Sequence, residues 1–186
     1  MKAFAAGLAA VLISCAAAAN PGQPDGKSVL PPADVQAATP RFERDYIKVL
    51  QDARTRFETA PTAEARNSTR IAMQIRLHEL LGLNHEARDW TGRIRDVRTF
   101  ADHRKSIIVE IEPNITVATW QNPFFDGQYA TLINPDSPLY KTLEKAGVGA
   151  PVKFSAILIG GRVSDDEEMI ERPEVVAKFI TIELLD

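Results

Sequence analysis

Four aromatic residues lie close together near the middle of the sequence, on either side of two turn signals. The dipeptides Asn122-Pro123 and Asp126-Gly127 are typical of turns, and the rings around them belong to Trp120, Phe124, Phe125 and Tyr129. Rings on a loop present flat apolar faces that can stack on a sugar ring or on a peptide. The pattern therefore predicts a binding loop, and the alternative that the same rings pack as core stays open.

Neither the histidines nor the longest acidic run has the spacing of a metal site. A zinc-protease motif needs two histidines four residues apart with Glu directly after the first. His78-Glu79 and His85-Glu86 lack the second histidine, and His103 stands apart from both. The contiguous acids of residues 165–168 do not alternate as calcium ligands do in an EF-hand loop. The sequence therefore predicts no bound metal.

Three acidic residues, Asp96, Glu110 and Asp126, are the candidates for acid–base catalysis, but no motif pairs them. Gly160-Gly161-Arg162 is not followed by the Lys-Ser/Thr of a phosphate-binding loop. No serine stands in a Gly-x-Ser-x-Gly elbow. We therefore expect a non-catalytic protein without a cofactor, and an enzyme that uses these acids is the alternative.

The first 19 residues have the composition of a secretory signal. Lys2 precedes an uncharged run over residues 3–19 that ends in small residues. The run is shorter than the roughly 20 apolar residues that a membrane-spanning helix needs. We therefore expect the segment to be removed and the mature protein to work outside the cytoplasm, in the periplasm of the cell envelope.

Two cleavage positions fit this signal segment. Leu12-Ile13-Ser14-Cys15 resembles the bacterial lipobox, in which the Cys is lipidated and becomes the new N-terminus. Ala17-Ala18-Ala19 before Asn20 matches an ordinary A-x-A site. The first position predicts a lipoprotein anchored to the membrane through Cys15, and the second predicts a freely secreted chain. Cys15 is the single Cys of the chain, so neither position leaves an intrachain disulfide.

Residues 20–39 and the charge balance add two constraints. The prolines of this segment prevent a regular element, so we expect an extended tether; they are Pro21, Pro24, Pro31 and Pro32. The chain has 22 basic and 25 acidic residues and a net charge of −3. Nucleic-acid-binding domains usually have a strong basic excess, so we expect no nucleic-acid partner.

The pattern over residues 40–83 predicts an antiparallel helical hairpin. Thr39-Pro40 is a helix-start signal, and the apolar residues that follow recur at helical spacing: Phe42, Tyr46, Val49, Ala53 and Phe57. After Pro61-Thr62 a second helical stripe consists of Met73, Leu77, Leu80 and Leu81. Ile71 and Ile75 project to the opposite side, which indicates a helix covered on two sides. Gly82 is a helix-ending glycine.

From residue 88 onward the apolar period changes from helix to strand. We expect strands at 90–97, 106–112, 115–120, 152–159 and 175–184, with a short helix at 137–146. Three strands, one helix and two strands is the element order of the oligonucleotide/oligosaccharide-binding (OB) fold, a five-stranded barrel. Gly92 suits a sharp bend in the first strand. The predicted fold class is α+β, with the hairpin packed on an OB-like barrel over 88–186, and another small barrel or an open sheet is the alternative.

Several short motifs in this half also occur, in the same order, in a family of proteins. They are Trp90-x-Gly92-x-Ile94-x-Asp96-Val97, Val109-Glu110-Ile111, Thr119 with Asn122, Thr131-Leu132-Ile133, Ser137-Pro138-Leu139-Tyr140 and Val152-x-Phe154-Ser155. Over residues 88–185 the chain resembles a group of uncharacterised bacterial envelope proteins with an OB-like domain. Ala156 stands where that group typically has Gly, and the stretch around Phe124-Phe125-Asp126 differs from it. The resemblance implies a fold and a bacterial origin, and it implies no activity.

These features together predict a non-catalytic envelope protein that binds a protein or glycan partner through its barrel. Two alternatives remain, which are an envelope enzyme of unknown reaction and a single-strand nucleic-acid-binding domain. The second rests on analogy of fold alone, and the acidic charge balance argues against it.

Overall fold

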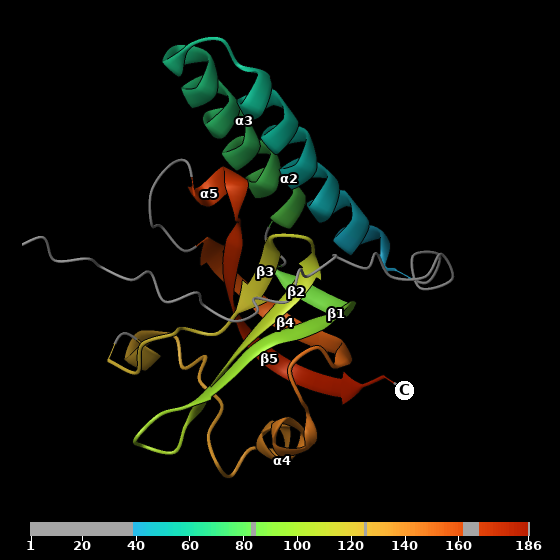
Figure 1. Cartoon of the computed structure of the whole chain (residues 1–186), viewed down its shortest axis with the longest axis vertical. Helices are drawn as coiled ribbons and strands as arrows, with labels where there is room; N and C mark the ends of the chain where they lie inside the picture. The colour runs from blue at the N-terminus through green and yellow to red at the C-terminus, as the bar shows by residue number, and fades with distance from the viewer. Residues whose placement is uncertain (1–38, 83–84, 125, 162–167, 186) are drawn as a thin grey trace, which may run out of the picture. The chain divides into compact units, whose positions relative to one another are not determined.

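Two α-helices begin the part of the chain that the computed structural model describes, which is residues 39–82, 85–124, 126–161 and 168–185 (Figure 1). They are α2 (Arg41–Thr59) and α3 (Ala63–Leu81). The side chain of Thr62 caps α3 by accepting the N–H of Ala65, and Gly82 ends it with a φ of 53°. The predicted capping role of Thr39 is wrong, because the N-cap residue of α2 is Pro40, in an extended conformation without a side-chain cap bond.

The apolar faces of the two helices are not covered equally. The buried apolar residues of α2 lie on one stripe, which comprises Tyr46, Leu50, Ala53 and Phe57. On α3 Met73 is buried, whereas Ile71 is 44% exposed and Ile75 is 52% exposed. The prediction that α3 is covered on two sides is therefore wrong for the described residues, because nothing among them packs over the two isoleucines.

The helices are followed by a closed barrel of five strands. The strands are β1 (Glu86–Thr99), β2 (Lys105–Glu112), β3 (Ile115–Ala118), β4 (Pro151–Gly161) and β5 (Glu174–Leu184), and their order around the barrel is β1-β2-β3-β5-β4. All neighbouring pairs are antiparallel except β3 and β5, which are parallel. This arrangement is compatible with an OB-like fold. The predicted α+β class, with two helices before a five-stranded barrel, is confirmed.

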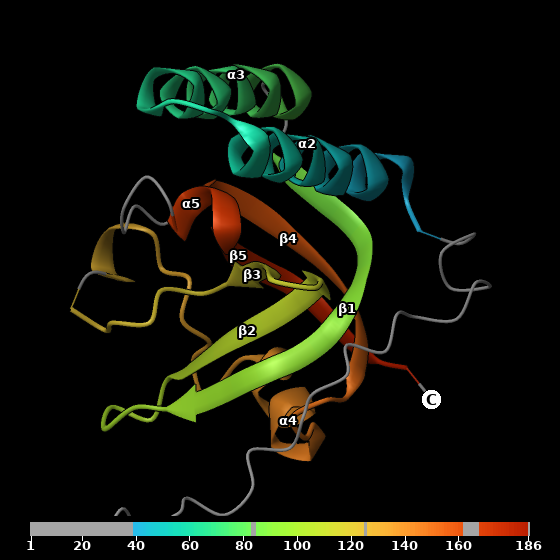
Figure 2. The same cartoon turned by 45° about the horizontal axis from the view of Figure 1, so that its top comes forward.

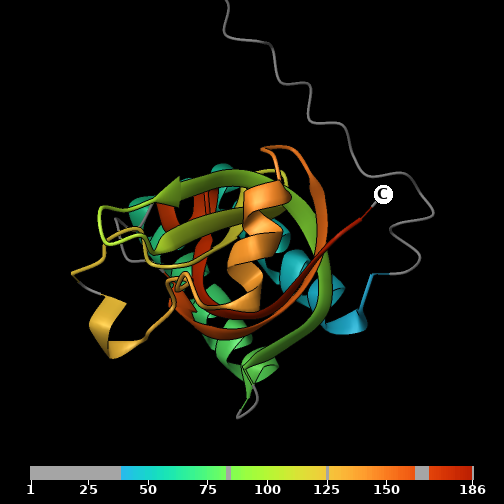
Figure 3. The same cartoon turned by 90° about the horizontal axis from the view of Figure 1, so that it is seen from below.

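Three short helices complete the described part of the fold. They are the 3-10 helix η1 (Asp126–Gln128), α4 (Pro138–Lys145) and α5 (Glu168–Glu171). The side chain of Ser137 caps α4 by accepting the N–H of Leu139. Leu143 of α4 is buried in the core, and Figures 2 and 3 show α4 at one end of the barrel, with α2 at the other end. No helix of the described residues has the length and apolarity that crossing a membrane requires.

Gly92 lies where β1 changes partners. Up to Arg93 the strand pairs with β4, and from Arg93 onward it pairs with β2. A side-chain carbon built on Gly92 would lie 2.6 Å from the carbonyl oxygen of Glu110 and 2.6 Å from Cγ1 of Val109. The bend predicted from the sequence is therefore also a close approach of two strands, which only a residue without a side chain allows.

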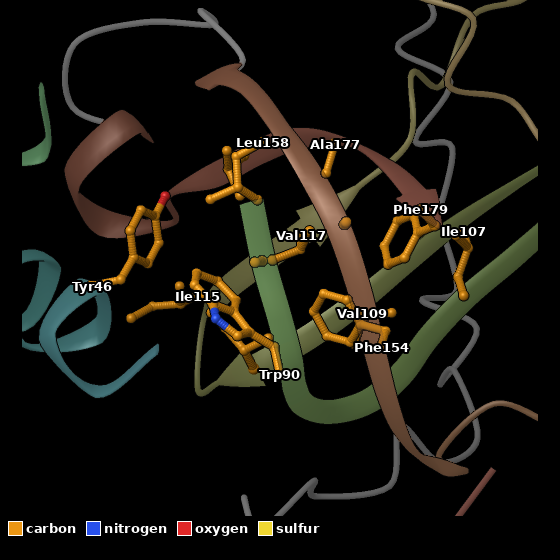
Figure 4. Packing of buried hydrophobic residues seen from close by; sticks show 14 of the residues in the cluster. Tyr46, Trp90, Ile107, Val109, Ile115, Val117, Phe154, Leu158, Ala177 and Phe179 are labelled. Carbon is orange, nitrogen blue, oxygen red and sulfur yellow. The ribbon is translucent and has the colours of Figure 1, made fainter. Parts of the chain in front are cut away.

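An aromatic cluster connects α2 to the interior of the barrel (Figure 4). Trp90 of β1 is fully buried, and its ring centroid lies 5.4 Å from that of Phe42 and 5.3 Å from that of Tyr46, both on α2. On its other side Trp90 contacts the ring of Phe154 of β4 at 6.3 Å between centroids. Burying such rings is the main stabilising contribution available where α2 meets the barrel.

Candidate binding site on the loop after β3

The chain leaves β3 at Thr119, earlier than predicted, and a loop over residues 119–134 carries the predicted aromatic site. The Oγ1 atom of Thr119 accepts the N–H of Ile107 at 3.0 Å, so a side chain takes the place of a strand carbonyl. At the far end of the loop, Lys105 and Ile133 exchange backbone hydrogen bonds of 2.9 Å. Both ends of the loop are therefore fastened to β2.

Asp126 is the internal anchor of the loop. Its side chain is buried, with 1% of the residue exposed. Oδ1 accepts the N–H of Thr131 at 2.6 Å, the hydroxyl of Thr131 at 2.7 Å and the N–H of Leu132 at 3.1 Å. Bonds to a charged acceptor are stronger than neutral ones, so this carboxylate fixes the turn between residues 126 and 132.

Arg104 connects the loop to the turn between β1 and β2. Its Nη1 donates to Oδ2 of Asp126 at 2.9 Å, and its Nε donates to Oδ2 of Asp102 at 2.8 Å. Nη2 donates to the carbonyl of Pro123 at 3.4 Å. Because the carboxylate of Asp126 is buried, removing its cationic partner would leave an uncompensated charge. These contacts therefore connect the loop, at Pro123 and Asp126, to the β1–β2 turn.

The rings of the predicted site do not belong to the buried core. Phe124 is 93% exposed and Tyr129 is 39% exposed, while Trp120 is half-buried. The rings of Trp120 and Tyr129 lie 6.0 Å apart between centroids with an interplanar angle of 32°. Phe125, the fourth predicted residue, lies outside the described residues. The three described rings thus form a partly exposed pair with a projecting phenyl group nearby in the same loop.

The backbone of the loop is strained at one position. Ala130 has a φ of 49°, in the left-handed region that residues other than Gly rarely adopt. The N–H groups of Tyr129 and Ala130 both donate to the carbonyl of Asp126, at 3.0 and 2.7 Å. Strained backbone persists only where its surroundings determine it, and it concentrates at functional sites. Here the hydrogen bonds to Asp126 hold the backbone of Ala130 in this conformation.

Two of the groups around this loop were not predicted from local sequence patterns. Arg104 is 22 residues from its partner Asp126, a separation that no local pattern reveals. Lys105 has a largely buried side chain whose Nζ lies 4.4 Å from the ring centroid of Tyr140, on α4. Thr131, by contrast, belongs to one of the motifs on which the family resemblance rests.

The acidic residues considered for catalysis do not gather at one site. Asp96 pairs with Arg98 at 3.7 Å and Glu110 pairs with Arg95 at 3.3 Å, while Asp126 pairs with Arg104. Each carboxylate therefore has its own arginine. Among the described residues no group of three His, Cys, Asp or Glu side chains is placed to hold a metal ion. Residues 165–167 of the acidic run lie outside the described part.

One buried acid was missed by sequence reasoning. Glu43 of α2 is 1% exposed, and both its carboxylate oxygens accept the N–H of Thr91 of β1, at 3.1 and 3.2 Å. Burial raises the pKa of Glu43 to about 8, against the lowering effects of the Thr91 hydrogen bond and of Arg44. Its helical spacing to Tyr46 and Leu50, which places it on the apolar face of α2, is the signal that could have found it.

Comparison with known proteins found no protein-family model, no curated protein and no solved structure that matches this chain. The family resemblance therefore rests on the short motifs alone. Cys15, both cleavage positions and residues 20–38 of the tether lie outside the described residues.

Proposed function

We propose that this chain is a non-catalytic protein of the bacterial cell envelope that binds a protein or glycan partner through an OB-like barrel. The binding surface is the loop that carries Trp120, Phe124, Phe125 and Tyr129. The observation that carries the proposal is the nearly complete exposure of Phe124 on a loop that a partly buried ion pair, Arg104 with Asp126, connects to the neighbouring turn.

A rigid exposed ring is suited to binding for an energetic reason. Ordering a flexible loop opposes association, and a loop that is already ordered avoids most of that cost. Aromatic anchors that enter a partner's pocket are typical binding hot spots, worth about 2 kcal/mol or more each. Asp126 and Arg104 therefore support the site by positioning the loop, without contacting the partner.

The outer face of β2 argues against a nucleic acid as the partner. OB folds bind oligonucleotides and oligosaccharides on the face formed by strands 2 and 3. Ile107, Val109 and Ile111 of β2 belong to the core, so the alternate residues Ile108, Glu110 and Glu112 face outward. Two of these three are acidic and none is aromatic, whereas single-strand binding uses basic grooves and stacked rings.

Location in the envelope follows from the N-terminal signal and is part of the same proposal. In this proposal the lipid on Cys15 anchors the protein, residues 20–39 act as a tether, and the barrel reaches a partner in the periplasm. The rigid loop then presents Phe124 to an envelope protein in preference to a soluble one.

Replacing Phe124 with a photo-cross-linking phenylalanine analogue is expected to capture a defined envelope partner in the bacterial host. The matched control is the same analogue at Val148, an apolar residue that is 74% exposed outside the loop. Cross-linked bands specific to position 124 indicate a protein partner. Co-sedimentation of the purified protein with cell-wall sacculi, weakened at least about tenfold by Phe124→Ala, indicates a glycan.

The test has a stability control and an outcome that contradicts the proposal. Phe124→Ala changes an exposed side chain, so the free energy of unfolding should stay within about 0.5 kcal/mol of the natural protein. If position 124 captures nothing that position 148 does not capture, and sacculi binding is also unchanged by Phe124→Ala, the loop is not the binding surface.

Cys15→Ala is expected to abolish anchoring through a lipid. The natural protein should fractionate with membranes, and the variant should be released or keep its signal segment, because only Cys can accept the lipid. Mass spectrometry of the mature N-terminus provides the independent readout. A mature chain that begins at Asn20 would contradict the lipoprotein assignment and support ordinary secretion.

A further inference from the structure

The outward side of the helical pair contains a groove of about 630 Å³ between α2 and α3. Its floor is apolar, and it consists of Val49, Ala53, Ala72, Met73 and Leu80. The side chains that rim it are mostly charged, among them Asp45, Lys48, Asp52, Arg56, Arg76 and Glu79. Figures 1 and 2 show the two helices side by side, and the residues that line the groove lie within 45–56 of α2 and 68–80 of α3. An apolar floor with charged rims is the cross-section of a helix–helix interface.

Two exposed isoleucines lie on α3 beside one edge of the groove. Ile71 and Ile75 are the exposed large apolar residues among the described residues of the helical pair. Ile71 follows Ser68 by three residues and Ile75 precedes Glu79 by four, and both of those residues line the groove. Residues three and four apart are neighbours on a helix surface. The isoleucines therefore border the polar edge of the groove, on the side of α3 away from the floor residues Met73 and Leu80.

The charges along α2 have an order that is complementary to itself. Read from the N-terminal end, the groove residues of α2 are Asp45, Lys48, Asp52 and Arg56, which alternate negative and positive. Read from the other end, the same series alternates positive and negative. Two copies of α2 laid antiparallel therefore place every charge opposite its counterpart. A two-fold interface joins a surface to its own copy, so it requires this property.

We propose that this face binds a second copy of the chain, with α2 and α3 of each protomer forming a four-helix bundle about a two-fold axis. In that arrangement Arg56 of one protomer meets Asp45 of the other at both ends of the interface. Ile71 and Ile75 of each copy lie at the edge of this interface. The aromatic loop is not part of this surface, so the inference stands independently of the proposed partner binding.

The size of the surface predicts the strength of the dimer. Helices of 19 residues are roughly 28 Å long, and two of them side by side are roughly 20 Å wide. Each protomer thus contributes on the order of 500 Å², and the total of about 1,000 Å² is at the lower limit for specific interfaces. We therefore expect a reversible dimer with a dissociation constant in the micromolar range, of the order seen for small interfaces.

Sedimentation of the full chain over a concentration series tests the proposal. A Cys15→Ala background excludes both a lipid and an intermolecular disulfide as causes of association. Arg56→Glu places like charges together at both ends of the interface, and Asp45→Arg does the same with the opposite sign. Each variant alone is expected to weaken dimerisation at least about tenfold.

Mixing the two variants provides the specific readout. In a heterodimer of Arg56→Glu with Asp45→Arg, both ends again pair opposite charges, so dimerisation should return to nearly the natural strength. Ile75→Glu should weaken the dimer while leaving the melting temperature nearly unchanged, because the side chain is at the edge of the interface and is exposed in the protomer. A monomer at roughly 100 µM, or a dimer whose strength none of these variants changes, would overturn the proposal.

Discussion

The free energy of unfolding is expected to fall by up to about 5 kcal/mol as the pH rises from 4.5 to about 8, because of Glu43. Below pH 4.5 this carboxyl group is protonated in both the folded and the unfolded chain. Between the two values the unfolded chain ionises and the folded chain does not, so each increase in pH favours unfolding. Above pH 8 both forms are ionised and the loss is complete.

The physical cause of this effect is the place of Glu43 in the fold. The carboxyl group lies between α2 and β1, where ionisation would place a charge on a buried side chain. Glu112 of β2 adds to the effect, because its negative charge opposes a second one on Glu43. The hydrogen bond from Thr91 and the positive charge of Arg44 only partly offset the burial.

Chemical denaturation at pH values from about 4 to about 9 measures the effect. Glu43→Gln keeps the size of the side chain and an acceptor for the N–H of Thr91, and it cannot ionise. The variant should therefore lose most of the pH dependence in this range. Glu58→Gln, at an exposed position of the same helix, is the matched control and should retain it. Equal pH profiles for all three proteins would show that Glu43 ionises normally in the fold.

Gly92→Ala is expected to destabilise the barrel by about 3 kcal/mol or more. The added carbon would lie 2.6 Å from a backbone oxygen of β2 and 2.6 Å from the buried side chain of Val109. Neither group can move without disturbing the pairing of β1 with β2. The strain therefore falls on the point where β1 passes from β4 to β2, on which closure of the barrel depends.

Gly147→Ala is the matched control for this substitution. A carbon built on Gly147 meets no atom within 4 Å, so the change should shift stability by no more than about 1 kcal/mol. Thermal melting of both variants, followed by far-ultraviolet circular dichroism, gives the comparison. If Gly92→Ala melts at the temperature of Gly147→Ala, the two strands can separate without cost and the close approach is not structurally important.

The aromatic loop and the groove between α2 and α3 are shaped by different kinds of interaction. The aromatic loop is built by a buried carboxylate and its arginine, so its shape depends on Asp126 and Arg104. The outward groove of the helices is a by-product of the spacing of apolar residues on α2 and α3, and it needs no polar anchor. A single chain can therefore use one surface for a partner and the other for a second copy of itself.

Local patterns in the sequence were sufficient to predict the two long helices, α4 and the five strands, but not the short helices η1 and α5. Apolar residues at helical spacing predict α2 and α3, and alternation predicts the strands, because both depend only on backbone geometry over a few residues. Thr62 and Ser137 cap helices, and Gly82 ends one, by contacts within their own turns. Gly92 signals a bend because the lack of a side chain is visible in the sequence itself.

Contacts between distant residues decided the rest, and no local pattern contains them. Glu43 is buried by a strand 48 residues away, and Asp126 meets an arginine 22 residues away. Trp90 and Phe124 are both aromatic residues near turns or bends, yet one is fully buried and the other is 93% exposed. Burial, pKa and exposure depend on which elements arrive around a side chain, so they are properties of the tertiary structure.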